Sequence, residues 1–325
     1  MKLLLLAQRD TPALFGGPDG PLGRGYMGHL TGIIADLAPA DPSHAHAFAF
    51  RRVEGEIYAR RRIRIRDEAL HREGLPNIGF WIDNAAKEDP RHGSAVASAK
   101  VLAARAAAGF RGDGDLAPHL RNVARAPLSA AAGLSRILAL HASARLTGHL
   151  PRPSLHIPSG PGMWEMRYHA EQRPDPANRV SLSASRRDSQ GLPALQIDFR
   201  FGDRDVADVV RAHDLLDADL RASGAGRLNL RGTPEAMAGM VADFARDGYH
   251  QIGGAVMSAE PGAGVVDADG RVHGLPNLWV ASSCTFPSGG HANPTLTIVA
   301  LSLRIADRLA RTSVRPCRRV ALLGA

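Results

Sequence analysis

Residues 290–297 read Gly-His-Ala-Asn-Pro-Thr-Leu-Thr and end a glycine-rich loop with Asn293-Pro294. Asn is a favoured helix N-cap, and Pro suits the first helical position because its missing N–H would have no intrahelical partner there. The residues that follow carry apolar side chains at helical spacing: Leu296, Val299, Ala300, Leu303, Ala306 and Leu309 or Ala310. The sequence therefore predicts an amphipathic helix from Asn293-Pro294 to about Arg311.

A second segment, Tyr-His-Gln-Ile-Gly-Gly over residues 249–254, places His250 beside two glycines. A neutral imidazole is the usual group for removing a hydroxyl proton near neutral pH. Glycines permit close approach of a planar ligand. The chain has 14 histidines, most of which must be ordinary, so spacing alone does not single out His250.

The loop before the predicted helix, residues 286–292, lets backbone approach a ligand where a helix N-terminus offers free N–H groups and partial positive charge. An anion would be stabilised there. A phosphate fits, and so does the edge of a reduced flavin ring, which becomes negative after accepting hydride. The plain alternative is a well-capped helix with no ligand.

Composition sets wider limits. The 325 residues are 44% hydrophobic, enough for one large or two ordinary domains. The net charge of +8 comes mostly from dispersed Arg, and the densest basic run, residues 58–66, partly alternates Arg with Ile. That alternation favours a strand with one solvated face over a phosphate-contacting patch. Two cysteines, Cys284 and Cys317, suggest no disulfide framework.

The N-terminal run Leu3–Leu6 is shorter than a signal-peptide core, and charged residues follow at once, so a buried strand is expected. No stretch approaches the roughly 20 apolar residues of a membrane helix. We therefore expect a soluble, cytoplasmic protein.

Hydrophobic periodicity and turn residues predict the remaining elements. Helices are expected over residues 93–109, 129–148, 203–223 and 234–246, and strands over 32–37, 164–170, 179–183, 194–201 and 277–281. The strands between 164 and 201 are expected to be antiparallel members of one sheet. Residues 264–273 are expected to form a hairpin, and residues 151–162 an exposed connection.

Two other enzyme classes fit poorly. The separations of His250, His273 and His291 match no compact metal-ligand pattern, so no metal site is predicted. No Gly-x-Ser-x-Gly elbow occurs, which disfavours a serine hydrolase.

Several segments together resemble the C-terminal signature of the glucose-methanol-choline (GMC) flavoprotein oxidoreductases. They are residues 249–254, 265–267, 271–281, 286–287 and 291–297, with residues 171–182, Asp188 and 191–193 resembling the substrate-domain segment. Leu3–Leu6 and residues 23–29 look like a mid-chain strand and loop of the family. The resemblance implies FAD as cofactor and oxidation of a CH–OH group, in an alcohol, sugar or sterol, by hydride transfer to the flavin.

The resemblance also implies roles for individual residues. His250 would be the base that takes the hydroxyl proton, and Asn293 would hydrogen-bond the same oxygen. Pro294 and Thr295 match the helix start that faces the flavin ring. Ser282 stands where many members have Asp, so contact with the cofactor is expected from the backbone of Ser282 or Ser283.

One family feature is missing from its usual setting. Members begin with a strand, a Gly-x-Gly-x-x-Gly turn and a helix that bind the ADP half of FAD, whereas Gly23-Arg-Gly-Tyr-Met-Gly28 has only the spacing. We therefore expect an α+β or α/β fold made of a partial FAD-binding domain (residues 1–40 and 245–315) without its N-terminal Rossmann unit, and an antiparallel-sheet substrate domain with helices (residues 41–244). The expected partners are a small alcohol and a separate N-terminal FAD-binding polypeptide, without nucleic acid. The alternative is a truncated, cofactor-free remnant or binding module.

Overall fold

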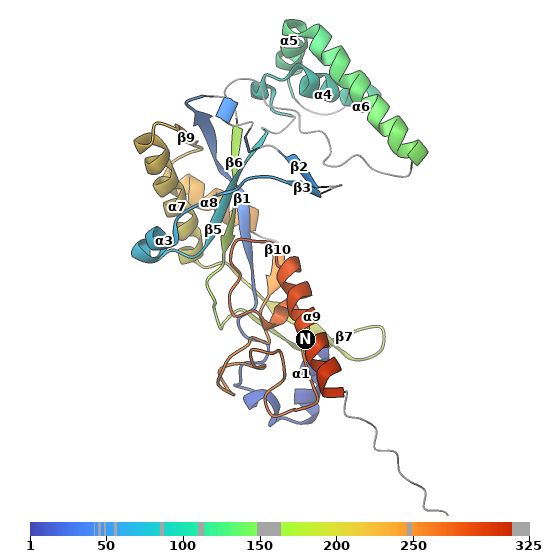
Figure 1. The fold of residues 1–325 in the computed structure, drawn as a ribbon, viewed down its shortest axis with the longest axis vertical. Helices are drawn as coiled ribbons and strands as arrows, with labels where there is room; N and C mark the ends of the chain where they lie inside the picture. The colour runs from blue at the N-terminus through green and yellow to red at the C-terminus, as the bar shows by residue number, and fades with distance from the viewer. Residues whose placement is uncertain are drawn as a thin grey trace, which may run out of the picture. The chain divides into compact units, whose positions relative to one another are not determined.

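The computed structural model describes residues 1–41, 43–44, 47–48, 50–54, 57–84, 88–109, 114–147, 164–245 and 249–313 (Figure 1). The chain forms two compact units. Unit 1 comprises Met1–Leu30, Glu171–Gly202 and the described part of Arg246–Ala325, and unit 2 comprises the described parts of Thr31–Ala170 and Asp203–Ala245. The expected connection over residues 151–162 lies outside the described residues, as does Cys317.

Unit 2 contains an antiparallel sheet built on β1 (Met27–Pro39), whose first residues belong to unit 1. Its strands follow the order β1, β6 (Trp164–Glu171), β5 (Ile78–Asn84) and β4 (Ile63–Arg64), and β9 (Gly226–Leu230) pairs antiparallel with β1. β2 (Arg51–Glu54) and β3 (Ile57–Ala59) form a separate ribbon. Ile33 and Ile34 are both buried, so both faces of β1 are covered.

Helices complete unit 2. α7 (Asp203–Ala222) packs against β9 and α8 (Pro234–Phe244), and α8 is capped by Thr233, whose hydroxyl accepts the Ala236 N–H. α4 (Ala95–Ala107), α5 (Ala117–Arg125) and α6 (Pro127–Thr147) pack together (Figure 1). Small alanine side chains form the buried part of their contact. The short helices α3 (Asp67–Glu73) and η2 (Pro90–His92) lie in the connections. The four predicted helices and the strand at 32–37 are confirmed, as is the mixed helix and antiparallel-sheet class.

Unit 1 holds the elements around the two opening segments. They are α1 (Lys2–Asp10), η1 (Leu14–Gly16), the start of β1, the β7 (Arg179–Arg187) and β8 (Pro193–Asp198) hairpin, β10 (Tyr249–Ile252), η4 (Ser283–Thr285) and α9 (Thr295–Ser313). Residues 171–202, expected in the substrate domain, group with this unit. The assignment of FAD-binding and substrate-binding roles to chain segments stays a prediction.

The predicted N-terminal strand is wrong, because Lys2–Asp10 form α1. A run of four leucines has no period that separates a strand from a helix. Lys2, Ala7, Gln8 and Arg9 have good helix propensity, and no residue of the segment is β-branched. Leu4 and Leu5 are buried in one apolar cluster with Val180 and Val265, whereas Leu3 is 80% exposed, so burial selects one helical face.

Two strand predictions are also corrected. β6 does not belong to one sheet with β7 and β8, which form a two-stranded ribbon of their own. Residues 277–281 are not a buried strand: Trp279 makes a single antiparallel bridge to Arg271, and Leu278 is 36% exposed. The hairpin at 264–273 is reduced to the bridge between Val266 and Val272, beside a turn in which the Gly270 N–H donates to the Asp267 carbonyl.

The predicted C-terminal helix is confirmed as α9, but several residues of its predicted apolar face are exposed. Leu296 is 81% exposed, Val299 49% and Leu303 62%. Ile298 and Leu301 instead pack against the cluster of Met27, Ile252 and Phe286, and Ile305 is buried. Both faces carry apolar residues at helical spacing, so periodicity alone did not identify the face that meets the core.

Among the described residues, no single helix has the length and apolar character to cross a membrane, and only the bent pair formed by α5 and residues 127–143 of α6 meets those criteria jointly.

His213 on α7 is fully buried between the rings of Phe80 and Tyr168. Its Nδ1 lies 2.8 Å from the Val209 carbonyl oxygen and donates to it, while Nε2 has no hydrogen-bond partner among the described residues. Burial lowers the pKa of His213 to about 4. The native state therefore holds this imidazole neutral.

We predict that unit 2 loses stability as the pH falls. Between the unfolded pKa of about 6.5 and the folded value of about 4, the unfolded chain binds more protons, so the free energy of unfolding decreases with decreasing pH. The loss attributable to His213 between pH 7.5 and 5 is about 2 kcal/mol. Urea unfolding at both pH values measures it. His213→Asn should remove this component, and His141→Asn, at an exposed position on α6, should retain it.

Candidate active site

His250 lies in a strained bulge of β10. This strand pairs antiparallel with the start of β1, with Met27 opposite Ile252 and His29 opposite Tyr249. Three steps along β10 therefore face two along β1, which is the geometry of a β-bulge. His250 has φ +59°, in the left-handed region that costs a non-glycine residue about 1–3 kcal/mol. Such strain persists only where the surroundings hold it.

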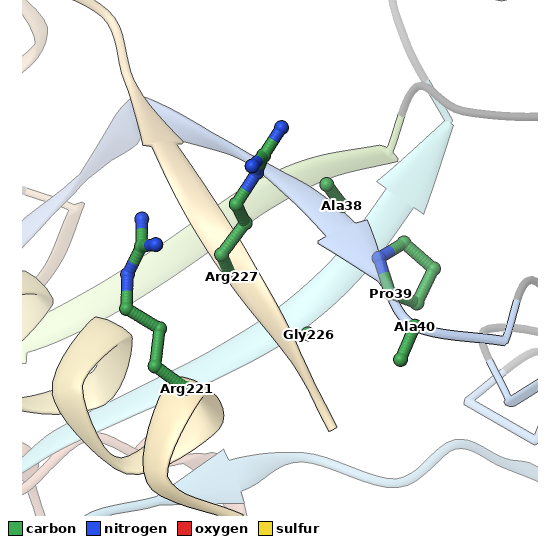
Figure 2. A pocket seen from close by; sticks show the side chains of 6 residues that line it. All are labelled: Ala38, Pro39, Ala40, Arg221, Gly226 and Arg227. Carbon is green, nitrogen blue, oxygen red and sulfur yellow. The ribbon is translucent and has the colours of Figure 1, made fainter. Parts of the chain in front are cut away.

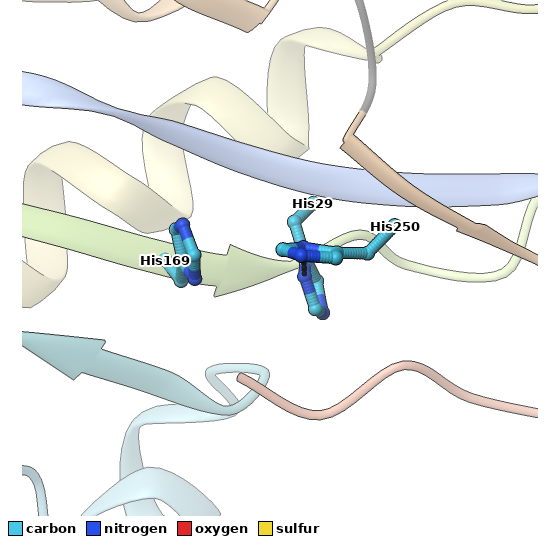
Figure 3. A group of neighbouring side chains, drawn as sticks. All are labelled: His29, His169 and His250. Carbon is cyan, nitrogen blue, oxygen red and sulfur yellow. Dashed lines mark hydrogen bonds between the residues drawn. The ribbon is translucent and has the colours of Figure 1, made fainter. Parts of the chain in front are cut away.

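One residue that holds His250 is His29, which is 1% exposed. The Nδ1 atoms of the two imidazoles are 3.0 Å apart (Figure 3). Nε2 of His29 lies 2.8 Å from the carbonyl oxygen of Gly290. Burial, followed by the neighbouring His250, lowers the pKa of His29. His169, also drawn in Figure 3, belongs to unit 2, where its ring stands edge-on to Trp81.

The loop before α9 is fixed by a second side chain. Oε1 of Glu171 accepts the N–H of Gly289 at 2.9 Å, next to the Gly290 carbonyl held by His29. The neighbouring Gln172 accepts the Gly28 N–H at 3.0 Å and donates to the Arg200 carbonyl at 2.7 Å. Glu171 and Gln172, at the end of β6 and just after it, thereby link the glycine loop to the start of β1 within unit 1.

Gly253 and Gly254 lie where two parts of the chain approach each other closely. Gly253 has φ +79°, and a Cβ there would lie 1.9 Å from the Gly25 carbonyl oxygen; at Gly254, with φ +94°, a Cβ would lie 2.7 Å from the Met1 methyl group. The chain itself therefore occupies the positions that a Cβ would take at both glycines, and the approach of a planar ligand beside them stays a prediction. The two glycines allow β10 to pass close to the N-terminal segment.

The two predicted cofactor-contacting serines lie beside β10. Ser283 Oγ donates to the Gln251 carbonyl at 3.0 Å, and the Ser283 carbonyl accepts the Gly253 N–H at 3.2 Å. Ser282 Oγ accepts the Cys284 N–H and caps η4. Both side chains therefore have structural partners, and their contact with a cofactor stays a prediction.

Asn293 and Thr295 are exposed at the start of α9. The helix begins at Thr295, and the Pro294 carbonyl accepts the Ile298 N–H at 2.9 Å. Because the N-cap carbonyl accepts the first helical hydrogen bond, Pro294 is the N-cap residue. The helix therefore starts one residue later than predicted, and Asn293 precedes the N-cap. Asn293 follows the Gly290 carbonyl, and with it the His29 contact, by three residues.

Residues 23–28 do not form a dinucleotide-binding turn. They lead into β1 and not into a helix. The Gly23 N–H donates to the Gly254 carbonyl at 2.6 Å, and the Gly23 carbonyl accepts the Val180 N–H at 2.7 Å. These backbone groups bind the protein itself, as the missing strand–turn–helix setting predicted.

A shallow hollow in unit 2 is separate from these residues. It has a volume of about 430 Å³ and is lined by Ala38, Pro39, Ala40, Arg221, Gly226 and Arg227 (Figure 2). Arg221 pairs with Asp217 on its own helix at 2.8 Å. The hollow contains none of the predicted site residues.

Residues 174–302 match the family model described as GMC oxidoreductase. Over these residues the chain is similar to the GMC oxidoreductases. The match includes His250 and Asn293, and its first residues are those of the β7 and β8 hairpin of unit 1. The matching residues therefore include chain segments from both units.

Three relatives show the extent of the GMC similarity. A paromamine 6'-oxidase of Streptomyces fradiae is 36% identical over 42% of this chain and 24% of its own length. The fructose dehydrogenase large subunit of Gluconobacter japonicus is 32% identical over 43% and 24%. A 2-methyl-1,2-propanediol dehydrogenase of Mycolicibacterium austroafricanum is 30% identical over 43% and 24%. The matched segment spans about a quarter of the length of these relatives.

The sequence did not identify His29 or Glu171 as site residues. His29 stands 221 residues before His250, and Glu171 stands 118 residues before Gly289, so no local pattern joins either pair. The family resemblance included both residues in its matching segments but assigned neither a role. Only the folded geometry of unit 1 reveals their contacts.

We predict that Gly253→Ala destabilises unit 1 by more than Gly191→Ala. Both glycines have φ near +80°, so both alanine variants carry the same backbone strain of roughly 1 kcal/mol. Only at Gly253 does the new Cβ collide with backbone, whereas nothing lies within 4 Å of it at Gly191. The difference in unfolding free energy should exceed about 1 kcal/mol in urea titrations. Equal losses in the two variants would show that the close approach to Gly25 is absent.

Proposed function

We propose that this chain provides the proton-removing and substrate-orienting part of an FAD-dependent oxidoreductase that oxidises a CH–OH group. The observation that carries the proposal is His250, which lies inside the region that matches the GMC family, has φ +59° and is hydrogen-bonded to the buried His29. Strain of this kind is concentrated at functional sites. Of the two non-glycine residues with positive φ among those described, His250 is the one with an acid–base side chain.

The residues of unit 1 fit the ring end of a flavin. The first turn of α9 has backbone N–H groups without intrahelical partners and a partial positive charge, and Thr295 is exposed there. A Cβ at Gly290 would meet nothing within 4 Å, so the loop is open on that side. Pro294, Thr295 and the backbone at Ser282 and Ser283 would hold the ring. When bound, the flavin supplies the acceptor for hydride.

The protein's own residues handle the proton. An alcohol gives up its hydroxyl proton to His250 as its carbon loses hydride, and a neutral imidazole titrates in the range this transfer needs. Asn293 offers a neutral amide to the same oxygen and so orients the reacting carbon. His29 and Glu171 hold β10, which carries His250, and the loop that leads to Asn293 in fixed positions.

The relatives suggest the class of substrate. Their names give a fructose dehydrogenase and a diol dehydrogenase, and both substrates are small polyhydroxy compounds. We propose a small alcohol or sugar as the substrate of this chain.

A second polypeptide region would supply the rest of the FAD site. None of the described residues forms the strand–turn–helix unit that binds the pyrophosphate, and the relatives are about four times longer than the matched segment. The exposed apolar face of α9, with Leu296, Val299 and Leu303, is a surface that such a region would cover. We propose that this FAD-binding region completes the site, in the same polypeptide or in a separate one.

The test is to co-express the chain with the coding region immediately upstream of Met1 and to measure bound flavin by its visible absorbance. We expect a yellow complex that oxidises small polyols with an artificial electron acceptor. In His250→Asn, flavin binding should persist while turnover falls by roughly 10²–10⁴-fold, the usual contribution of a positioned base.

His141→Asn, far along α6 in unit 2, is the matched control and should leave both flavin binding and turnover unchanged. Full turnover in His250→Asn would refute the assignment of the base. A complex without flavin would refute the FAD proposal and favour the cofactor-free binding module.

A further inference from the structure

We infer that His29 is a positioning residue that sets the tautomer of His250, with the proton on Nδ1 of His250 and the lone pair on its Nε2. The inference rests on the proposed function, because it concerns the nitrogen that would receive the substrate proton. Three groups of unit 1 form the chain of contacts: the Gly290 carbonyl, His29 and His250.

The Gly290 carbonyl fixes the first link. A carbonyl oxygen only accepts hydrogen bonds, so the 2.8 Å contact requires a hydrogen on Nε2 of His29. The oxygen belongs to a loop that Glu171 holds through the neighbouring Gly289 N–H, so it is anchored independently of the histidines. The orientation of His29 is therefore determined from outside the pair.

His29 passes this constraint to His250. A neutral imidazole with its hydrogen on Nε2 has a lone pair on Nδ1, so Nδ1 of His29 accepts across the 3.0 Å contact. Nδ1 of His250 must then be the donor. A neutral His250 with its hydrogen on Nδ1 carries its own lone pair on Nε2.

The neutral form of His29 is the one that its surroundings favour. The side chain is 1% exposed, and a charged imidazolium there would be desolvated and would face a second histidine. Both effects lower the pKa of His29, although the Gly290 and Gly289 backbone and the Glu171 charge act in the opposite sense. A doubly protonated His29 would reverse the donor at Nδ1 and give His250 the other tautomer.

The arrangement has a chemical consequence. The hydroxyl proton of the alcohol moves to Nε2 of His250, and the resulting imidazolium keeps donating from Nδ1 to His29, which stabilises the new charge. The same His29 side chain holds the Gly290 carbonyl three residues before Asn293. His29 thus orients both segments without touching the substrate.

The direct test is the nitrogen NMR spectrum of the full chain labelled with ¹⁵N at histidine. Ring-nitrogen shifts distinguish an N–H nitrogen from one that carries a lone pair. We expect the Nδ1–H tautomer for His250 in the wild-type chain. In His29→Leu, His250 should revert to the Nε2–H tautomer that free histidine favours.

The chain provides internal references for both tautomers. His213 donates from Nδ1 to the Val209 carbonyl at 2.8 Å, and His273 donates from Nε2 to the Ser258 carbonyl at 3.1 Å. His29→Asn is the conservative variant, because its amide oxygen lies where Nδ1 of His29 was and accepts from His250. It should retain the Nδ1–H form even where His29→Leu is poorly folded. An Nε2–H form of His250 in the wild-type chain would overturn the inference.

Kinetics of the flavin-loaded complex separate this inference from the proposed function. His29→Leu should lower kcat by roughly 10- to 100-fold, as loss of a group that orients a functional histidine typically does, with KM little changed. His29→Asn should recover most of kcat. If the complex binds no flavin, the NMR spectrum alone decides the tautomer of His250. If flavin is bound and His29→Leu has an unchanged kcat, the positioning role of His29 is contradicted.

Discussion

The contact between His29 and His250 is the interaction on which the proposed site depends. It joins the start of β1 to the bulge of β10, and through the Gly290 carbonyl it reaches the loop that leads to α9. The bulge has a cost of its own, since His250 occupies the left-handed region of backbone conformation. The hydrogen bonds of the buried His29 to His250 and to the Gly290 carbonyl help to keep that conformation in place.

Apolar packing and close backbone contacts supply the frame for this interaction. Met27, Ile252 and Phe286 form a cluster with Ile298 and Leu301 of α9, which fixes the distance between β10 and the helix. Because Gly253 has no Cβ, the end of β10 lies directly against the backbone of Gly25. The function proposed for unit 1 therefore uses residues from all three chain segments of the unit: His29 from the first, Glu171 from the second, and His250 and Asn293 from the third.

Part of this arrangement was predictable from the sequence. The helices with clear periodicity, such as 203–223 and 234–246, and the strand at 32–37 were predicted correctly, because 3.6-residue and extended apolar patterns are strong local signals. Leu3–Leu6 failed because an unbroken leucine run has no period, and the α9 face failed because both of its sides carry apolar residues. His29 was missed because its two partners lie 221 and 261 residues away, where no local pattern reaches.

A double-mutant cycle of His29→Leu and His250→Ala tests the central contact most directly. Hydrogen exchange at the amides of β10 and at Gly289 gives the local free energy of opening for the wild-type chain, both single variants and the double variant. We expect the two losses not to be additive, with a coupling of about 1 kcal/mol or more. Additivity within about 0.3–0.5 kcal/mol would contradict it, because the two imidazoles would then stabilise unit 1 independently.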